Sequence, residues 1–129
     1  MMKMTLRLML VALVVVVAAP SHAGEAWQAF TCQILDDTTE DHVVAMGSEW
    51  LKAAKSMKGG ENIEIHVAFP VAAQMGESDF RLLIKMPTIK EWGEFWDGYH
   101  GSPASKVDVK YQDMVDCPDR MLFEHVRIK

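Results

Sequence analysis

The 129-residue sequence lacks most of the motifs that identify a known chemistry. It has no glycine-rich phosphate loop, no GxSxG nucleophile turn and no CxxC pair. Its histidines are not spaced as HxH or at i, i+4, so the spacing predicts neither a metal site nor a cofactor. A metal site formed by side chains from different strands, or from the two chains of a dimer, remains the alternative, because sequence spacing does not reveal such a site.

Basic residues are scarce. The chain has 13 Lys and Arg against 18 Asp and Glu, a formal net charge of −5. A phosphate backbone requires a basic stripe, and none is present, so we do not expect nucleic acid as a partner. The same charge balance disfavours binding to an anionic membrane surface.

The longest hydrophobic run lies at the N-terminus and is too short for a membrane span. Lys3 and Arg7 precede an uncharged apolar stretch over residues 8–19, and small residues follow up to Ala23. This layout predicts a secretory signal peptide over residues 1–23, with an uncleaved anchor as the less favoured reading. The protein is then periplasmic or secreted, with no stable membrane anchor after cleavage. Removing Lys3 and Arg7 reduces the basic residues from 13 to 11 and changes the net charge to −7. Residues 24–129 have the length of one domain.

The sequence contains only two cysteines, Cys32 and Cys117. In an oxidising compartment an even cysteine count favours a disulfide, here between the start and the end of the domain. Free or metal-binding thiols are the alternative, but no neighbouring histidine or second cysteine supports them.

Four segments have the composition and alternation of strands: residues 26–35, 62–69, 79–86 and 121–128. In residues 62–69 and 79–86, apolar residues alternate with polar ones, which is typical of strands with one buried face. Cys117-Pro118 is expected to separate the last strand from the helical segment before it.

Two stretches between these strands have helical periodicity. Thr38 is the expected N-cap of the first, with Asp41 in the capping-box position. Its apolar stripe then recurs at steps of three and four: Val43, Met46, Trp50, Ala54 and Met57. Thr88 and Glu91 begin the second helix at capping-box spacing, and Ser102-Pro103 predicts a restart of the helix.

The resulting order is β-α-β-β-α-β, the split βαβ or ferredoxin-like pattern of an α+β fold. It predicts a four-stranded antiparallel sheet with the helices on one face. The first and last strands are neighbours in that topology, which brings Cys32 close to Cys117. The element order and the cysteine count are independent features of the sequence and predict the same contact, so they support each other.

On this element order, the length and the aromatic second helix, residues 27–129 resemble the dimeric α+β barrel superfamily. The resemblance implies a homodimer in which two sheets pack face to face. The superfamily includes cofactor-independent monooxygenases, haem-degrading and haem peroxidase-like enzymes, cyclases, isomerases and lyases. A shared fold does not select one of these chemistries.

His66 is the first candidate catalytic residue. It lies mid-strand on the polar side of residues 62–69, on the same side as Glu64. Arg81 of the next strand is expected to share that face and is a candidate ligand-binding residue. A histidine in such surroundings can act as a general base. The alternative is a solvated or dimer-buried sheet face on which His66 only bonds to a neighbour.

An aromatic cluster on the second helix supplies the other candidates. Trp92, Trp96 and Tyr99, with Trp50 of the first helix, are the side chains expected to line a ligand pocket between helices and sheet. His100, next to Gly101 at the end of this helix, is the second candidate catalytic group. The alternative is ordinary packing of an aromatic helix face on the sheet.

Three functions remain open at the level of sequence, and the sequence does not decide whether the protein is an enzyme. One is an enzyme acting on a small organic ligand by acid–base chemistry or cofactor-free oxidation. Another is a non-catalytic module that binds a ligand or partner. The third is a haem-binding protein with His66, His100 or His125 as axial ligand.

Overall fold

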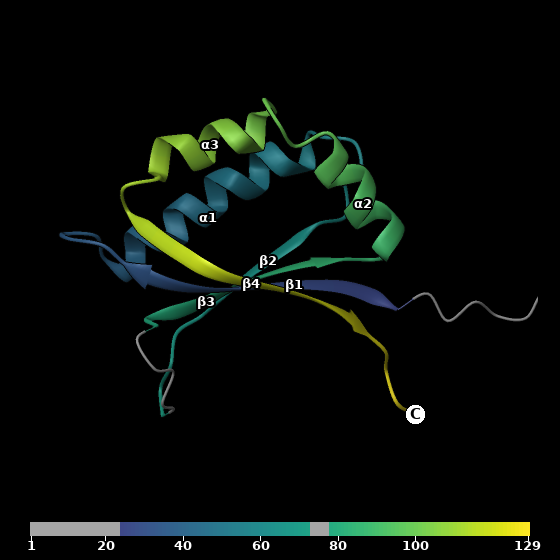
Figure 1. Ribbon diagram of the computed structural model, residues 1–129, viewed down its shortest axis with the longest axis horizontal. Helices are drawn as coiled ribbons and strands as arrows, with labels where there is room; N and C mark the ends of the chain where they lie inside the picture. Colours follow the sequence, from purple (N-terminus) through teal and green to yellow (C-terminus); the bar gives the residue numbers. More distant parts are fainter. Residues whose placement is uncertain (1–23, 73–77) are drawn as a thin grey trace, which may run out of the picture.

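The computed structural model describes residues 24–72 and 78–129. The predicted signal peptide, residues 1–23, lies outside the described residues. Three helices lie on one face of a four-stranded sheet (Figure 1). In chain order the elements are β1 (Glu25–Ile34), α1 (Glu40–Lys55), β2 (Glu64–Ala68), β3 (Phe80–Met86), α2 (Ile89–Asp97), α3 (Pro103–Tyr111) and β4 (Val115–His125).

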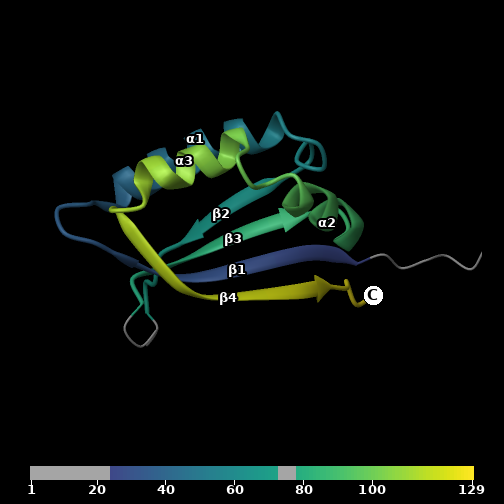
Figure 2. The same ribbon diagram turned by 45° about the horizontal axis from the view of Figure 1, so that its top comes forward.

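The strands are arranged in the order β2-β3-β1-β4, and every neighbouring pair is antiparallel. β1 is therefore central and adjacent to β4, as the element order predicted, and the ferredoxin-like α+β fold is confirmed. Figure 2 shows α1 and α3 side by side above the sheet, with α2 over the opposite end of the strands.

The two faces of the sheet differ because side chains alternate along each strand. The face under the helices carries fully buried residues such as Ala26, Phe80 and Met86. The other face, here called the open face, has no helix over it among the described residues (Figure 1). Its apolar centre comes from β1, β3 and β4: Trp27, Ala29, Leu83, Met121 and Phe123.

The last strand begins six residues earlier than predicted, at Val115 rather than Met121. Pro118 lies inside the strand because the register shifts there: Thr31 pairs with Asp119, but Gln33 pairs with Asp116. Such a bulge, on a strand at the edge of the sheet, accommodates a residue that has no N–H to donate. Cys117-Pro118 therefore does not break the strand.

Helix α1 also begins differently from the prediction, since its N-cap is Thr39 rather than Thr38. The Thr39 hydroxyl accepts a hydrogen bond from the His42 backbone N–H at 3.3 Å, and His42 Nδ1 accepts one from the Thr39 N–H at 3.1 Å. A histidine ring nitrogen thus fills the acceptor role that the prediction gave to Asp41. The predicted cap at Thr88 is confirmed, and so is the restart at Ser102-Pro103, where Ser102 is the N-cap of α3.

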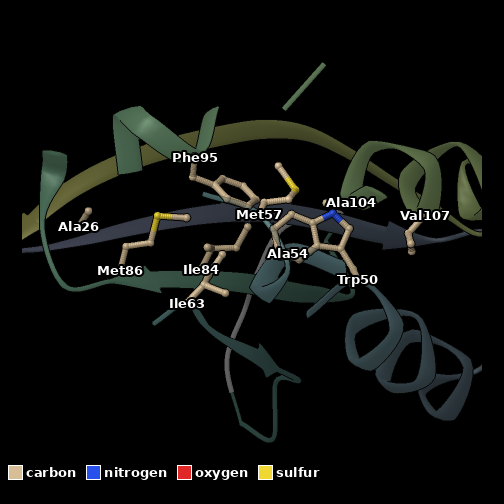
Figure 3. Packing of buried hydrophobic residues seen from close by; sticks show 10 residues of the cluster. All are labelled: Ala26, Trp50, Ala54, Met57, Ile63, Ile84, Met86, Phe95, Ala104 and Val107. Carbon is tan, nitrogen blue, oxygen red and sulfur yellow. The ribbon is translucent and has the colours of Figure 1, made fainter. Parts of the chain in front are cut away.

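The core consists of two clusters between the helices and the sheet. Figure 3 shows the larger one, in which Trp50 of α1 and Met57, just after the end of α1, face Phe95 of α2 above Ile84 of β3. The smaller one joins Val43 and Phe80 to Cys32, which forms the predicted disulfide with Cys117. The disulfide links β1 to the edge strand β4.

Candidate functional site

A pocket of about 380 Å³ lies between the helices and the covered face of the sheet. Its size is in the range of small-molecule sites. All four strands and all three helices contribute to its walls. The lining residues are Phe30, Met46, Gly47, Trp50, Ile65, Phe80, Leu82, Ile84, Trp96, Tyr99, Asp108, Tyr111, Gln112, Val115, Cys117 and Arg120.

Three of the predicted ligand-binding residues, Trp50, Trp96 and Tyr99, meet in this pocket. The Trp96 and Tyr99 rings lie 4.4 Å apart between centroids, because residues three apart are on the same side of a helical turn. The Trp50 indole N–H donates a hydrogen bond to the Tyr99 hydroxyl at 3.4 Å. The result is an aromatic wall with one internal hydrogen bond.

The Trp96 indole nitrogen is buried and has no hydrogen-bond partner, alone among the side-chain nitrogen and oxygen atoms of the described residues. The other two helix-borne indoles are paired, Trp50 with Tyr99 and Trp92 with the Gln28 side-chain oxygen at 3.1 Å. A buried donor left without an acceptor costs about 1–3 kcal/mol. Trp96 therefore lines the pocket with part of its ring while its N–H is enclosed and unpaired.

Asp108 is the one acidic side chain in the pocket lining. Loss of solvation raises the pKa of its carboxyl to about 6, and a hydrogen bond from Trp50 acts in the opposite direction. The residue keeps an exposed surface, so water still reaches it. A carboxyl with this pKa can exchange a proton near neutral pH, which is what general acid–base catalysis requires.

Asp108 was not among the residues singled out from the sequence. A signal was present, since Asp108 lies four residues after Ala104 and three before Tyr111, on the side of α3 that faces α1 and the sheet. An acidic residue within the apolar stripe of a helix indicates a partly buried carboxyl.

The pocket rim is held by polar contacts between α1 and α3. Lys110 Nζ lies 2.8 Å from Glu49 Oε1, and the Tyr111 hydroxyl donates to Glu49 Oε2. Hydrogen bonds from Lys110 and Tyr111 lower the pKa of Glu49. These contacts hold the end of α3 against α1 and keep Tyr111 in place in the pocket lining.

The remaining predicted site residues lie elsewhere. Trp92 packs against the core and does not line the pocket. His100 is exposed in a separate hollow of about 610 Å³ at the end of α2, together with Glu94 and Asp97. Arg81 is exposed on the open face. The structure thus brings together three of the five predicted ligand-binding residues and neither predicted catalytic histidine.

His66 lies on the open face at one end of a polar cluster around Trp27. Its ring stacks on Trp27 with centroids 6.1 Å apart, and its Nε2 is 3.4 Å from Glu64 Oε2. His125 contacts Trp27 from β4, with centroids 5.4 Å apart. A hydrogen bond from Trp27 lowers the pKa of Glu25 in the same cluster, assisted by Lys85. His66 and His125 are thus held by neighbours but are not in the pocket.

Within residues 24–72 and 78–129, no group of three or more His, Cys, Asp or Glu side chains is arranged to hold a metal ion. No helix in this described part of the chain is long and apolar enough to cross a membrane.

Comparison with known proteins gives matches in structure only. No protein-family model and no curated protein matches the sequence. A NIPSNAP family protein of unknown function from Agrobacterium tumefaciens is 13% identical, with a TM-score of 0.58 over 84% of this chain and 94% of that chain. Hydroxynitrile lyase from Passiflora edulis is 4% identical, with a TM-score of 0.55 over 83% of this chain and 96% of that one.

A putative chlorite dismutase is 15% identical, with a TM-score of 0.51 over 82% of this chain. The match covers 46% of the dismutase chain, so this protein corresponds to about half of it. At such identities the likeness is one of fold and leaves the chemistry open. In fold, the protein is similar to the ferredoxin-like, dimeric α+β-barrel proteins.

Proposed function

We propose that this protein binds a small, largely apolar organic molecule in the pocket between its helices and sheet. The observation that carries the proposal is the pocket itself, in which the aromatic side chains Trp50, Trp96 and Tyr99 surround open space of about 380 Å³. Small-molecule sites combine such apolar walls with a few polar groups that orient the ligand. Here those groups are contributed by Tyr99, Asp108 and Arg120.

Acid–base turnover of the bound molecule is the second candidate function, and Asp108 favours it. A carboxyl at a pocket wall with a pKa near 6 is a suitable proton acceptor at neutral pH. Neither His66 nor His100 lines this pocket, so their catalytic roles stay predictions that would need a different site. Replacing His66 with Ala is expected to leave ligand binding in the pocket unchanged.

The haem-binding alternative gains no support from the pocket. Among the described residues no histidine lines it, and His66, His100 and His125 all lie outside. The three histidines proposed as axial haem ligands are therefore not available in this cavity.

We also propose export of the mature chain and assembly as a homodimer. Export is supported by the signal-like residues 1–23 and by the disulfide, which persists in oxidising compartments. Dimerisation is supported by the apolar centre of the open face, where Met121 and Phe123 are 46% and 49% exposed. A second copy packed on that face would cover it. The intact mass of protein recovered from an exported fraction tests cleavage after Ala23.

Gly47 offers a direct test of ligand binding. It is buried on the inner side of α1, and a Cβ added there would meet nothing within 4 Å. In Gly47→Leu the larger side chain is expected to take up space in the pocket wall. Gly93 of α2 is the matched control, since an added Cβ there is equally unobstructed but the residue does not line the pocket.

The experiment is calorimetric titration with indane, an apolar two-ring molecule. We expect the wild type and Gly93→Leu to bind indane and Gly47→Leu to lose binding by tenfold or more. Equal binding by all three proteins, or no binding of either indane or its ketone 1-indanone to the wild type, would overturn the proposed function.

A further inference from the structure

We infer that the molecule bound in this pocket is an organic cation, an apolar ring body with one ammonium group, and that the Asp108 carboxylate holds its charge beside the aromatic side chains of the wall. The inference rests on the proposed function and narrows it to a chemical class, small cyclic amines. Asp108 becomes the residue that determines specificity in a pocket whose other walls are chiefly apolar.

The first argument is that Asp108 has no cation of its own. In the part of the chain that the structure describes, no ion pair includes Asp108, and the nearby Lys110 instead binds Glu49 at 2.8 Å. The hydrogen bond that Asp108 receives comes from the neutral indole of Trp50. Carboxylates that lose solvation against apolar walls are normally paired with a cation. Because Asp108 lines the pocket, the ammonium group of a ligand can supply that cation.

The second argument is the aromatic character of the wall. Six of the lining residues are aromatic: Phe30, Trp50, Phe80, Trp96, Tyr99 and Tyr111. The face of an aromatic ring carries partial negative charge, so it attracts an organic cation and repels an anion. The Tyr99 ring is inclined by 39° to that of Trp50 and by 50° to that of Trp96, so the three rings do not form one flat surface. Inclined rings beside a carboxylate suit an ammonium group attached to an apolar body.

The third argument concerns Arg120, the one basic side chain in the lining, which on its own would favour an anion. Arg120 is exposed on the edge strand β4, where it pairs with Phe30. An arginine in such a position covers apolar surface with its methylene groups and keeps its charged end in water. The whole chain has a net charge of −5, so its field also attracts cations rather than anions.

The test compares three compounds that share one ring system and differ in charge: indane, the cation 2-aminoindane and the anion indane-2-carboxylate. At about pH 7.5 both the amine and Asp108 carry their charges. By calorimetric titration the wild type is expected to bind 2-aminoindane at least about tenfold more tightly than indane, the difference that one charged hydrogen bond makes. It should bind the carboxylate no more tightly than indane.

Two matched variants assign the preference to Asp108. Asp108→Asn keeps the size of the side chain and removes its charge, so we expect it to bind 2-aminoindane and indane alike. Asp113→Asn removes the same charge from an exposed position outside the pocket and should keep the tenfold preference. Gly47→Leu should weaken binding of 2-aminoindane as it does that of indane, because both compounds occupy the same space.

The comparison of the three compounds in the wild type does not depend on how the variants fold. Equal affinities for 2-aminoindane and indane, or tighter binding of the carboxylate, would overturn this inference while leaving ligand binding in the pocket intact. A tenfold preference that survives in Asp108→Asn would also overturn it, since another group would then hold the ammonium. Absence of binding by 2-aminoindane and by the neutral compounds indane and 1-indanone would instead overturn the proposed function and the inference with it.

Discussion

At the residue scale, environment rather than residue type sets the chemistry of the pocket. The ordinary pKa of histidine is near neutral, yet no histidine of the described residues lines the pocket. Asp108 has an ordinary pKa far below neutral, and its position against the apolar pocket wall raises it to about 6. The sequence shows where an aspartate is, but its pKa depends on neighbours that only the folded chain brings close.

The raised pKa of Asp108 predicts a pH-dependent contribution to stability. Between the ordinary pKa of 3.8 and about 6, the native protein holds a proton on Asp108 that the unfolded chain has released. The contribution of this group is thus fully present below about pH 4 and is lost as pH rises through 6. Asp108→Asn removes it, so the free energy of unfolding of the wild type should fall relative to the variant over that interval.

Urea denaturation of both proteins from about pH 4 to pH 7 measures this difference. All other titrating groups are common to the two proteins and cancel in the comparison. Parallel stability profiles would show that the Asp108 carboxyl titrates as it does in the unfolded chain.

At the element scale, the spacing of apolar residues predicted whether each element is a helix or a strand. Local hydrogen bonding decided the residue at which the element begins. Residues 62–69 and 79–86 alternate as strands because only one face is buried, and β2 and β3 confirm this. The start of α1 differs by one residue because two adjacent threonines are both suitable caps. β4 starts earlier because a bulge accepts Pro118, and the bulge depends on the partner strand β1.

The position of the α1 cap can be tested with adjacent substitutions. Thr39→Ala removes the side-chain acceptor for the His42 N–H and should lower the free energy of unfolding by about 1 kcal/mol. Thr38→Ala is the control, because the Thr38 hydroxyl makes no hydrogen bond with a described residue, and it should change stability little. Chemical denaturation measures both variants. A larger loss of unfolding free energy in Thr38→Ala than in Thr39→Ala would favour Thr38, the N-cap predicted from the sequence.

At the scale of the whole molecule, the disulfide and the open face connect distant parts of the chain. Cys32 and Cys117 are 85 residues apart and join the central strand to the edge strand. The edge strand carries Met121 and Phe123 of the open face, so the disulfide also supports the proposed dimer surface.

Removing the disulfide should destabilise the protein strongly. In the chain-entropy description, a closed loop of 85 residues contributes about 4 kcal/mol, because the cross-link restricts the unfolded chain. Urea unfolding of the double variant Cys32→Ala/Cys117→Ala, compared with the oxidised wild type, measures the loss. A difference below about 1 kcal/mol would contradict the prediction.

The proposed dimer makes a separate prediction for Phe123. Phe123→Glu places a charge in the apolar centre of the open face and should convert the dimer to a monomer, because an unpaired charge is costly to bury. Val109→Glu is the control, since Val109 is 64% exposed on α3, on the opposite side of the sheet. Light scattering coupled to gel filtration reports the mass. A wild type with the mass of one chain would contradict dimer formation.

The sequence by itself determined the α+β class, the order of the strands and the disulfide partners. These follow from the spacing of apolar residues and from the presence of just two cysteines. Both properties can be read directly from the order of the amino acids. Tertiary structure alone decided which aromatic side chains surround a cavity and which fill the core. It separated Trp50, Trp96 and Tyr99 from Trp92, and it placed Asp108 in the wall rather than His66 or His100. The physical reason is that burial, pKa and hydrogen-bond pairing depend on contacts between residues far apart in sequence, which periodicity does not encode.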